Sequence, residues 1–508
     1  MSLYLGIDVS TQGIKCIVID TVKGEIAAES NVNFGKDLPE YNSPDGFLPN
    51  ASPLIRHADP MMWVDGLELA LERLQNTNID VGAVKGISGS AQQHGSVYLK
   101  SAIPCYNHKE KLSSQIRPIL SRQTSPIWMD RSTESVCKEF DSKFGNLLAM
   151  KTGSPAIERF TAAQIRAFYQ NEPKQYENTD KIHLISSFMA SVLCGKEAAI
   201  DYGDGAGMNL LDLTTLNWHE EFAEFTAPGL LKKLPAAASS HTVVGKLDAY
   251  FCKYGFQKDI PVLIWSGDNP NSLIGTGCFE PGVAGISLGT SDTLFMPMQT
   301  YHTDPLGYGH VFGNPSGGFM SLICFSNGSL AREKIRDLHK VDWRYFDVTA
   351  MQESEPGNHG KLMLPYFSAE STPLVLNPRV VRNYTQMTAA DDIRAILESQ
   401  ICSMRLHSEW IGEKITRIRL TGGASNSSAI QQIIADIFQA EVEIIQVTNS
   451  AGLGSAMRAA SAIENIKLKD LSTVFCKGIK VASPRLEYKD IYHGLLKEYH
   501  DFENNWDK

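Results

Sequence analysis

The stretch from residue 261 to residue 295, PVLIWSGDNPNSLIGTGCFEPGVAGISLGTSDTLF, limits the possible folds of this chain more than any other. A short apolar run at residues 262–265 predicts a buried strand. The turn-forming residues GDNP follow, so Asp268 stands at the carboxyl end of that strand. A helical stretch of small residues comes next. A second apolar strand is then predicted at residues 283–288, and it resumes at residues 293–295 after a short turn.

That turn, Gly289-Thr290-Ser291, has the composition of a phosphate site. A tight turn between a strand and its returning partner directs several backbone N–H groups and two hydroxyl groups toward one point. Asp268 provides a carboxylate on the same stretch. The combination predicts phosphoryl-transfer chemistry.

The amino terminus repeats this design. Residues 3–9 predict an alternating strand, residues 10–13 (STQG) a turn, and residues 15–20 the returning strand. Asp8 lies where the first strand enters the turn. Two hairpins of one design, far apart in the sequence, predict two related half-molecules that face each other across a nucleotide. We expect the domains to cover residues 1–277 and 278–508.

Size and composition exclude several other classes of protein. A chain of 508 residues is expected to form at least two domains, because single cores stop growing near about 250–300 residues. The net charge of −10 argues against a nucleic-acid partner. No uninterrupted apolar run of about 18 residues exists to span a membrane, and the first 20 residues lack the basic region of a signal peptide. We therefore expect a cytoplasmic protein.

The nine cysteines are scattered from Cys16 to Cys476 and include no CxxC pair. This pattern predicts reduced, buried thiols rather than a disulfide framework or a zinc site.

A helix is predicted from Pro60 to residue 75, and a buried helix at residues 182–193.

Polar side chains also follow a third predicted strand, at residues 84–88. The segment SGSAQQHGSVYL places Gln92, Gln93 and His94 where an α/β sheet usually presents ligand-binding groups. A lone histidine is most often structural. The flanking Gly89 and Gly95 and the position at a strand end make a polyol-binding role an equal alternative.

Three further segments leave their function open. The segment SPIWMD at residues 125–130 predicts a strand that carries Trp128 and Asp130 ahead of a helix from residue 132. Arg159 is expected in the first turn of the next helix, where a surface salt bridge is the simpler interpretation. Residues 201–209, DYGDGAGMN, lack the spacing and the closing Glu of a calcium loop, so a structural turn is favoured.

The carboxyl half has its own α/β pattern. A helix is predicted from Thr388, with Asp391 three residues on as a capping-box acid. A strand at residues 415–420, the turn TGGASN at 421–426 and a helix at 427–438 follow. The glycine pair makes the backbone flat enough for an adenine ring or a phosphate, although many such turns form only a tight corner. A small-residue helix is expected at residues 450–460. No Walker A or GxGxxG pattern occurs, which disfavours P-loop and dinucleotide-binding folds.

With these motifs in place, the chain resembles the FGGY carbohydrate kinases of the actin, hexokinase and heat-shock-chaperone ATPase superfamily. YLGIDVSTQGIK is similar to the amino-terminal phosphate motif of the family, SLGTSDTLF to its second phosphate motif, and LTGGASNSSAIQQIIADIF to its adenosine motif. The resemblance implies an α/β, two-domain actin-like (ribonuclease H-like) ATPase fold with a cleft for ATP and sugar between the domains.

The segments GSAQQHGSVYL, ERFTAAQI, DYGDGAGMNLL and SGDNP resemble the branch of the family that phosphorylates D-xylulose, especially its eukaryotic-type enzymes. By this resemblance ATP is the phosphoryl donor, Asp268 is the general base, and Asp8 holds Mg²⁺ through waters. The implied sugar contacts are Gln93, His94, Arg159, Asp268 and Asn269. The implied nucleotide contacts are Trp343, Gly422, Gly423 and Asn426 for adenine and ribose, and Thr11, Gln12, Lys15, Gly289, Thr290 and Ser291 for the phosphates.

Two alternatives remain open at this point. The first is another FGGY kinase that acts on ribulose, gluconate or glycerol. The second is a catalytically silent sensor or an actin-like assembly protein with the same ATP-binding elements. Retention of Asp268 together with both phosphate hairpins favours an active kinase. A homodimer is also left open.

Overall fold

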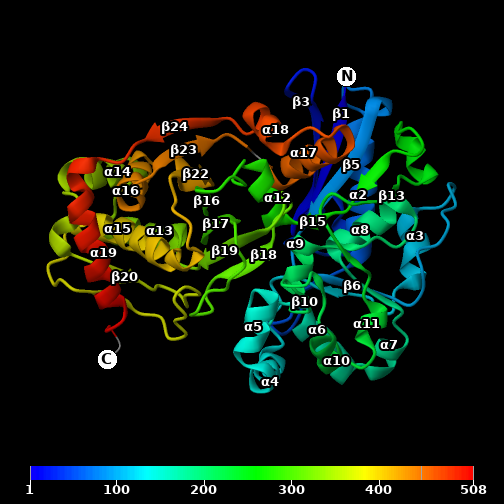
Figure 1. Cartoon of the computed structure of the whole chain (residues 1–508), viewed down its shortest axis with the longest axis horizontal. Helices are drawn as coiled ribbons and strands as arrows, with labels where there is room; N and C mark the ends of the chain where they lie inside the picture. Colours follow the sequence, from blue (N-terminus) through cyan, green and yellow to red (C-terminus); the bar gives the residue numbers. More distant parts are fainter. Residues whose placement is uncertain (1, 448, 507–508) are drawn as a thin grey trace. The chain divides into compact units, whose positions relative to one another are not determined.

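The computed structural model describes residues 2–447 and 449–506. Contacts between Cα atoms divide the chain into two units (Figure 1). The first unit comprises Met1–Gly277, Val311–Phe319 and Thr448–Cys476, and the second comprises Cys278–His310, Met320–Val447 and Lys477–Lys508. Each unit contains a central sheet with helices against it.

The sheet of the first unit begins with the predicted amino-terminal hairpin. Its strands run in the order β3 (Glu25–Asn33), β2 (Gly13–Asp20), β1 (Leu3–Val9), β5 (Val84–Ala91), β14 (Pro261–Leu263) and β13 (Val243–Lys246), and β15 (Ser266–Gly267) also pairs with β5. β1 and β2 are antiparallel, whereas β5 is parallel to β1. All residues of β1 are buried, as expected for a strand covered on both faces.

Helices α2 (Pro60–Gln75) and α17 (Ser450–Glu464) pack against this sheet (Figure 1). α2 begins where the sequence predicts, because the Asp59 carboxylate caps its first turn and Pro60 occupies its first position. α17 is the predicted small-residue helix, and it belongs to the first unit. A Cβ on Gly6 would stand 2.0 Å from the carbonyl oxygen of Gly452, so only glycine allows this close approach of strand and helix.

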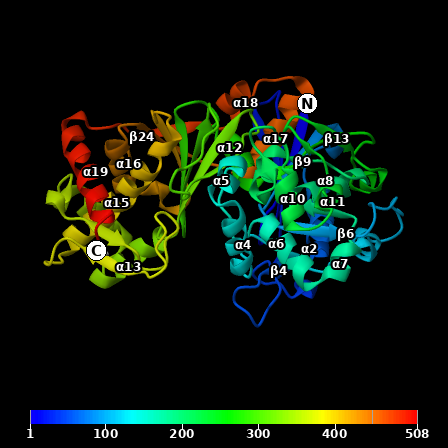
Figure 2. The same ribbon diagram turned by 60° about the horizontal axis from the view of Figure 1, so that its bottom comes forward.

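A second apolar core lies in the same unit. It is formed by α4 (Glu134–Phe144), α6 (Thr161–Asn171) and α10 (Glu220–Thr226), which Figure 2 shows grouped together. Two predictions in this region are wrong in detail. Only β7 (Ser125–Pro126) of the segment 125–130 is a strand, and the next helix begins at Glu134. The predicted helix at residues 182–193 begins as strand β8 (Lys181–Leu184) and becomes helix α8 (Ile185–Cys194).

The sheet of the second unit repeats the strand order of the first. Six of its seven strands run in the order β19 (Phe319–Phe325), β17 (Asp292–Met298), β16 (Val283–Leu288), β22 (Arg417–Thr421), β23 (Glu441–Ile445) and β24 (Gly478–Ala482). β16 and β17 form the second predicted hairpin, and β22 is parallel to β16. In both sheets an antiparallel hairpin is followed by a parallel strand next to its first member. The structure thus confirms the predicted internal duplication.

Helices α13 (Ser329–His339), α15 (Ala389–His407), α16 (Ser428–Phe438) and α19 (Lys489–Glu503) complete the second unit. The Thr388 hydroxyl caps α15, as predicted, by accepting a hydrogen bond from the Asp391 N–H. Among the described residues, we find no helix whose length and apolar character would let it cross a bilayer. All nine cysteines are free thiols and six of them are buried, which agrees with the pattern predicted from their spacing.

Candidate active site

The carboxyl ends of three strands meet at one edge of the first sheet. Asp8, next to the last residue of β1, pairs with Ser90 of β5, and Ser90 pairs in turn with Ser266 of β15. Asp268 is the first residue of helix α12 (Asp268–Gly275), which follows β15 directly. The structure therefore brings Asp8 and Asp268, which lie far apart in the sequence, to the same edge of the sheet.

Asp8 is a buried carboxylate, with 7% of the residue exposed. The Ser90 Oγ donates a hydrogen bond of 2.5 Å to its Oδ1. Burial raises the pKa of Asp8 to about 6, while the Ser90 hydroxyl and the Lys15 ammonium act in the opposite direction. Lys15 faces Asp8 across the β1–β2 hairpin.

Asp268 is partly exposed, and its pKa is raised to about 7. The largest cause is desolvation by burial, and the second is the negative charge of Asp8. The backbone N–H of Asn269 partly offsets both effects by donating a hydrogen bond of 2.8 Å to the carboxylate. A carboxylate with a pKa near neutrality can accept a proton from a substrate at physiological pH.

The Asn269 side chain connects Asp268 to a second strand end. Its Nδ2 donates to Oδ1 of Asp268 at 3.0 Å and to Oε1 of Gln93 at 2.9 Å. The two hydrogens of one amide group therefore fix the relative positions of three predicted sugar-binding residues. Gln93 is buried in the loop after β5.

His94 has a left-handed backbone conformation with φ 71°, which is rare for a residue with a side chain. Its Nδ1 lies 3.0 Å from the carbonyl oxygen of Gly207. Because a carbonyl can only accept, Nδ1 carries the hydrogen and the neutral ring keeps an acceptor at Nε2. The imidazole stacks on Phe160 with the ring centroids 4.3 Å apart. Backbone and ring contacts thus hold the imidazole in one orientation.

Arg159 does not lie in the first helical turn, and this prediction is wrong. Helix α6 begins at Thr161 with Phe160 as its N-cap residue, so Arg159 is in the preceding loop. The guanidinium carbon of Arg159 is 5.7 Å from the Phe160 ring centroid. Phe160 thus contacts both Arg159 and His94.

The first phosphate turn joins β1 to β2 and is closed by a hydrogen bond from the Ser10 N–H to the carbonyl oxygen of Gly13. The Trp128 Nε1 donates to Oγ1 of Thr11 at 2.8 Å, so the predicted Trp128 contributes to this turn from a loop. The side chains of Gln12 and Lys15 are exposed. They are therefore accessible to a ligand.

The second phosphate turn joins β16 to β17 in the second unit. The Gly289 N–H donates to Oδ1 of Asp292, and Arg332 makes two hydrogen bonds of 2.8 and 3.1 Å to the same carboxylate. Burial raises the pKa of Asp292, whereas Arg332 lowers it. Thr290 and Ser291 remain exposed at the tip of the turn. A buried ion pair therefore supports an exposed turn.

The glycine turn after β22 lies at the same edge of the second sheet as the second phosphate turn, because β22 is parallel to β16. Gly422 has φ 89°, and a Cβ there would stand 2.3 Å from the carbonyl oxygen of Leu288. No atom lies within 4 Å of the position that a Cβ on Gly423 would take. Gly422, Gly423 and Asn426 are exposed. Gly422 therefore lies close to the Leu288 backbone in a conformation that favours glycine, whereas the backbone at Gly423 is open.

Trp343 begins helix α14 (Trp343–Val348) and is 45% exposed. Asp347 of this helix accepts hydrogen bonds from Ser427 Oγ at 2.5 Å and from the Ser428 N–H at 3.2 Å. These bonds attach α14 to the first turn of α16, directly after the glycine turn. The structure therefore joins α14, the helix that carries Trp343, to the residues that directly follow the glycine turn.

Four residues that neighbour predicted site residues or turns were missed from the sequence: Ser90, Asp204, Asp292 and Asp347. Asp292 directly follows the predicted turn in GTSD, so its position could have suggested its role. Ser90 and Asp347 give no comparable signal, because each acts on a residue far away in the sequence. Asp204 lies in the segment that we interpreted as a structural turn. That segment forms the short helix α9 (Tyr202–Gly205).

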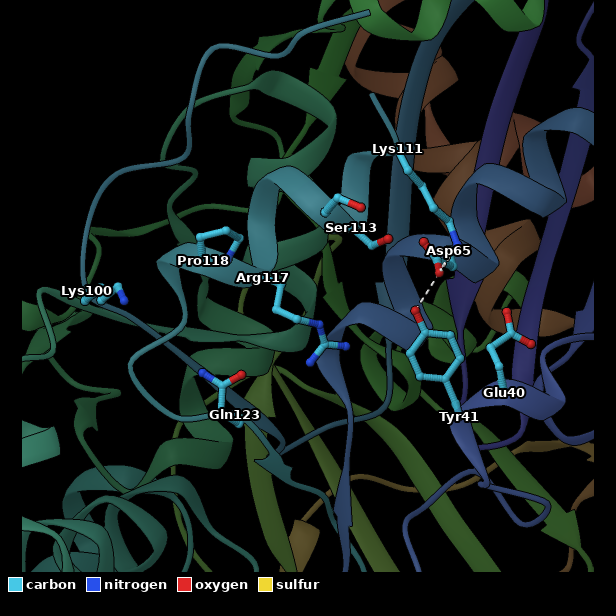
Figure 3. Close-up of a pocket in the computed structure, with 10 residues that line it drawn as sticks. Glu40, Tyr41, Asp65, Lys100, Lys111, Ser113, Arg117, Pro118 and Gln123 are labelled. Carbon is cyan, nitrogen blue, oxygen red and sulfur yellow. Dashed lines mark hydrogen bonds and ion pairs between the residues drawn. The ribbon is translucent and has the colours of Figure 1, made fainter. Parts of the chain in front are cut away.

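The hollow shown in Figure 3 lies elsewhere in the first unit and has a volume of about 520 Å³. None of the predicted site residues lines it. The Tyr41 hydroxyl and the Lys111 ammonium both donate to Oδ2 of Asp65, at 2.5 and 2.6 Å. Arg117 is paired with Asp59. These charges are paired with one another, and we assign no ligand to this hollow.

The two sheets of equal strand order, each with a turn at the end of its first hairpin, define a two-domain α/β protein of the actin-like ATPase fold. Solved structures agree with this class. A xyloylose kinase from Brucella ovis superposes with a TM-score of 0.85 at 21% identity, over 99% of each chain. A gluconate kinase from Lactobacillus acidophilus gives a TM-score of 0.85 at 20% identity, over 99% of this chain and 98% of that one.

The family profile described as "FGGY family of carbohydrate kinases, N-terminal domain" matches residues 3–275, and the corresponding C-terminal profile matches residues 284–463. This chain belongs to the FGGY family of carbohydrate kinases, which use ATP as the phosphoryl donor. The predicted family is confirmed.

Two eukaryotic relatives are similar along nearly the whole chain. Xylulose kinase of Rattus norvegicus is 37% identical over 523 residues, which cover 98% of this chain and 96% of the relative. Xylulose kinase 2 of Arabidopsis thaliana is 36% identical over 545 residues, which cover 99% of this chain and 97% of the relative. The predicted resemblance to eukaryotic-type xylulokinases is also confirmed.

Proposed function

We propose that this protein transfers the γ-phosphoryl group of ATP to the C5 hydroxyl of D-xylulose and forms D-xylulose 5-phosphate. The observation that carries the proposal is the similarity to xylulose kinases of a mammal and a plant over at least 98% of this chain. The set of polar side chains around Asp268 supports it, because a ketose needs several matched donors and acceptors.

In the proposed reaction Asp268 acts as the general base. Its carboxylate accepts the proton of the C5 hydroxyl while the hydroxyl oxygen forms a bond to the γ-phosphorus. The bond from that phosphorus to the β–γ bridging oxygen breaks, and ADP leaves. Phosphoryl transfer has a loose transition state, so positioning and electrostatic stabilisation supply most of the catalysis. A pKa of about 7 keeps Asp268 able to accept the proton near neutrality.

Gln93, His94, Arg159 and Asn269 would bind the remaining sugar oxygens. The amide of Asn269 and the imidazole of His94 are already held by hydrogen bonds within the first unit. A sugar hydroxyl that left one buried partner unmatched would lose about 1–3 kcal/mol of binding. We therefore assign the selection of the sugar to these four residues.

For the nucleotide we propose two sets of contacts. Trp343, Gly422, Gly423 and Asn426 would contact adenine and ribose; the attachment of α14 beside the glycine turn and the open backbone at Gly423 support this assignment. The phosphates would bind to the two turns, through Thr11, Gln12, Lys15, Gly289, Thr290 and Ser291. Exposed hydroxyls and backbone N–H groups in these turns support this assignment.

Asp8 would hold Mg²⁺ through waters. Mg²⁺ prefers oxygen ligands, keeps several waters, and is usually bound by one or two carboxylates together with substrate phosphates. The residues at this edge fit that requirement, since Asp8 and Asp268 are the carboxylates there. No cluster of three or more metal-ligating side chains occurs among residues 2–447 and 449–506. When bound, the ion would neutralise charge on the phosphates.

We also propose roles for the two domains, a cellular location and an oligomeric state. Residues 1–277 would bind the sugar and carry Asp268, and residues 278–508 would bind the nucleotide. The nine free thiols are compatible with the reducing cytoplasm. A homodimer is part of the proposal, and light scattering of the purified protein would test it.

The deciding experiment is a coupled measurement of ADP release with D-xylulose, ribulose, gluconate and glycerol. We expect the largest kcat/KM with D-xylulose. A larger value with another sugar would assign the protein to that branch of the family. If no sugar stimulates ADP release, and ATP instead causes filaments that scatter light, the protein is an assembly protein and the proposal fails.

A further inference from the structure

The segment from Asp201 to Gly207 supports three of the proposed sugar-site elements. The carbonyl oxygen of Gly207 holds Nδ1 of His94. The Asp201 carboxylate accepts a hydrogen bond from Ser266, two residues before Asp268. Asp204 lies beside Gln93, whose amide lowers the pKa of the Asp204 carboxyl group. The short helix α9 and the residues on either side of it thus contact three elements of the proposed sugar site.

Asp204 is the buried group in this segment that the proposed mechanism does not use. Only 1% of the residue is exposed. The Ser186 Oγ donates to its Oδ2 at 2.5 Å. Its Oδ1 and the Nε2 of Gln93 are both buried, and within the described part of the chain neither atom makes a hydrogen bond of full geometry. The Gln93 amide nevertheless lowers the pKa of Asp204, so the two groups are neighbours.

We propose that Asp204 is a positioning residue for Asp268 and acts through Gln93 and Asn269. The carboxyl group of Asp204 neighbours the Gln93 amide, whose Nε2 is the group that can donate to it, and the Oε1 of that amide accepts from Asn269 Nδ2. The same Nδ2 donates to Oδ1 of Asp268. Asp204 therefore sets which way the Gln93 amide points, and that amide in turn orients the base. This inference rests on the proposed function.

The protonation state of the Asp204 carboxyl group decides which hydrogen bonds it makes and which charge it places near Asp268. Burial is the largest cause of a pKa raised to about 8, to which the charges of Asp201 and Asp268 also contribute, while hydrogen bonds from Ser186 and Gln93 act in the opposite direction. At pH 7 most Asp204 is therefore a neutral acid, with its proton between Oδ2 and Ser186 Oγ so that Oδ1 can accept from Gln93, and Asp268 is about half ionised. Above about pH 8 a second negative charge would form near Asp268 and oppose the transfer of an anionic phosphoryl group.

The simpler interpretation is that Asp204 only ties α9 to α8 through Ser186. Two substitutions distinguish this structural role from the proposed positioning role. Asp204→Asn keeps the shape and a neutral group, because its oxygen can accept from Gln93 and its amide can donate to Ser186 Oγ. Asp204→Leu keeps the volume and leaves Gln93 without its neighbour. Asp212→Asn is the matched control, since Asp212 is a buried aspartate of the same unit that binds Thr214 and Lys151.

The test measures kcat and KM for D-xylulose and for ATP between pH 6 and pH 9. We expect Asp204→Leu to lower kcat by about 100-fold, as misplaced catalytic groups do, with little change in the KM for ATP. Asp204→Asn should stay within about threefold of wild type at pH 7 and should lose the fall in kcat above pH 8. Asp212→Asn should keep the wild-type kcat and its alkaline fall. A folded Asp204→Leu enzyme with wild-type kcat, or an alkaline fall that persists in Asp204→Asn, would overturn the inference.

The melting temperature gives a readout that needs no activity. The folded-state pKa of Asp204, about 8, is above the unfolded value of about 3.9. The neutral acid therefore contributes stability at low pH that is lost as the pH rises toward about 8. The wild type should become progressively less stable than Asp204→Asn over this range, and a constant difference contradicts a neutral Asp204. Wild-type protein that shows the melting trend but phosphorylates no sugar would refute the proposed function, not the ionisation of Asp204.

Discussion

Ser90 donates a hydrogen bond of 2.5 Å from its Oγ to Oδ1 of Asp8, across the parallel pairing of β5 with β1. The hydroxyl lowers the pKa of Asp8, while burial raises it. The loop that follows Ser90 carries Gln93 and His94. One strand end therefore supports both the proposed metal ligand and the proposed sugar contacts.

The first prediction concerns this bond. Ser90→Ala removes a group that lowers the pKa of Asp8, so the pKa should rise above about 6. A carboxylate must be deprotonated to bind a metal ion. We therefore expect a higher Mg²⁺ requirement for ADP release at pH 6.5 than in the wild type, and a smaller difference at pH 8. Asp8→Asn should raise the requirement at both pH values.

Ser88→Ala is the matched control, because Ser88 lies on the same strand and donates to a backbone carbonyl, that of Ile264. Its Mg²⁺ titration should equal that of the wild type. A Mg²⁺ titration unchanged by Asp8→Asn would rule out the metal role of Asp8.

The second prediction concerns the base. Asp268 must be ionised to accept a proton, and its pKa is raised to about 7. The kcat/KM for the sugar should therefore fall as the pH is lowered through about 7, well above the value of about 4 for an ordinary aspartate. Asp268→Ala should lower kcat by about 100-fold or more, with nucleotide binding retained. A variant that kept about a tenth of the wild-type kcat would contradict the general-base assignment.

The features that were predicted correctly from the sequence depend on short local patterns of residues. The two hairpins, the position of Asp268 after a strand, the caps of α2 and α15 and the glycine turn all follow from short patterns of apolar, turn-forming and capping residues. The repeated hairpin also predicts the repeated sheet, because a turn of this type requires the same two antiparallel strands. These features depend on neighbours within a few residues.

Features set by distant contacts could not be predicted in the same way. Arg159 lies outside α6 because Phe160 takes the N-cap position, where it packs on His94. Helix α17 joins the first unit because Gly6 and Gly452 allow a close approach that periodicity cannot reveal. The role that we propose for Asp204 depends on Gln93, which is remote in the sequence. Only the folded chain brings these pairs together.

The third prediction concerns the ion pair under the second phosphate turn. Arg332 and Asp292 are both buried, and the pair also holds the Gly289 N–H through Oδ1 of Asp292. Arg332→Met leaves a buried carboxylate without its partner, which costs about 3–5 kcal/mol. We expect a lower denaturant midpoint with an unchanged slope, and a higher KM for ATP. The double variant Asp292→Asn/Arg332→Met should recover part of the stability, and failure to recover any would indicate that lost packing causes the effect.

The fourth prediction uses the two adjacent glycines of the adenine turn. Gly422→Ala places a Cβ 2.3 Å from a backbone oxygen at φ 89°, so it should cost about 1–3 kcal/mol of stability. Gly423→Ala meets no atom within 4 Å and should leave the melting temperature nearly unchanged. If adenine lies against this backbone, the added methyl group of Gly423→Ala should still raise the KM for ATP. A Gly423→Ala enzyme with wild-type KM for ATP would place the adenine elsewhere, whereas equal melting temperatures for the two variants would contradict the close approach at Gly422.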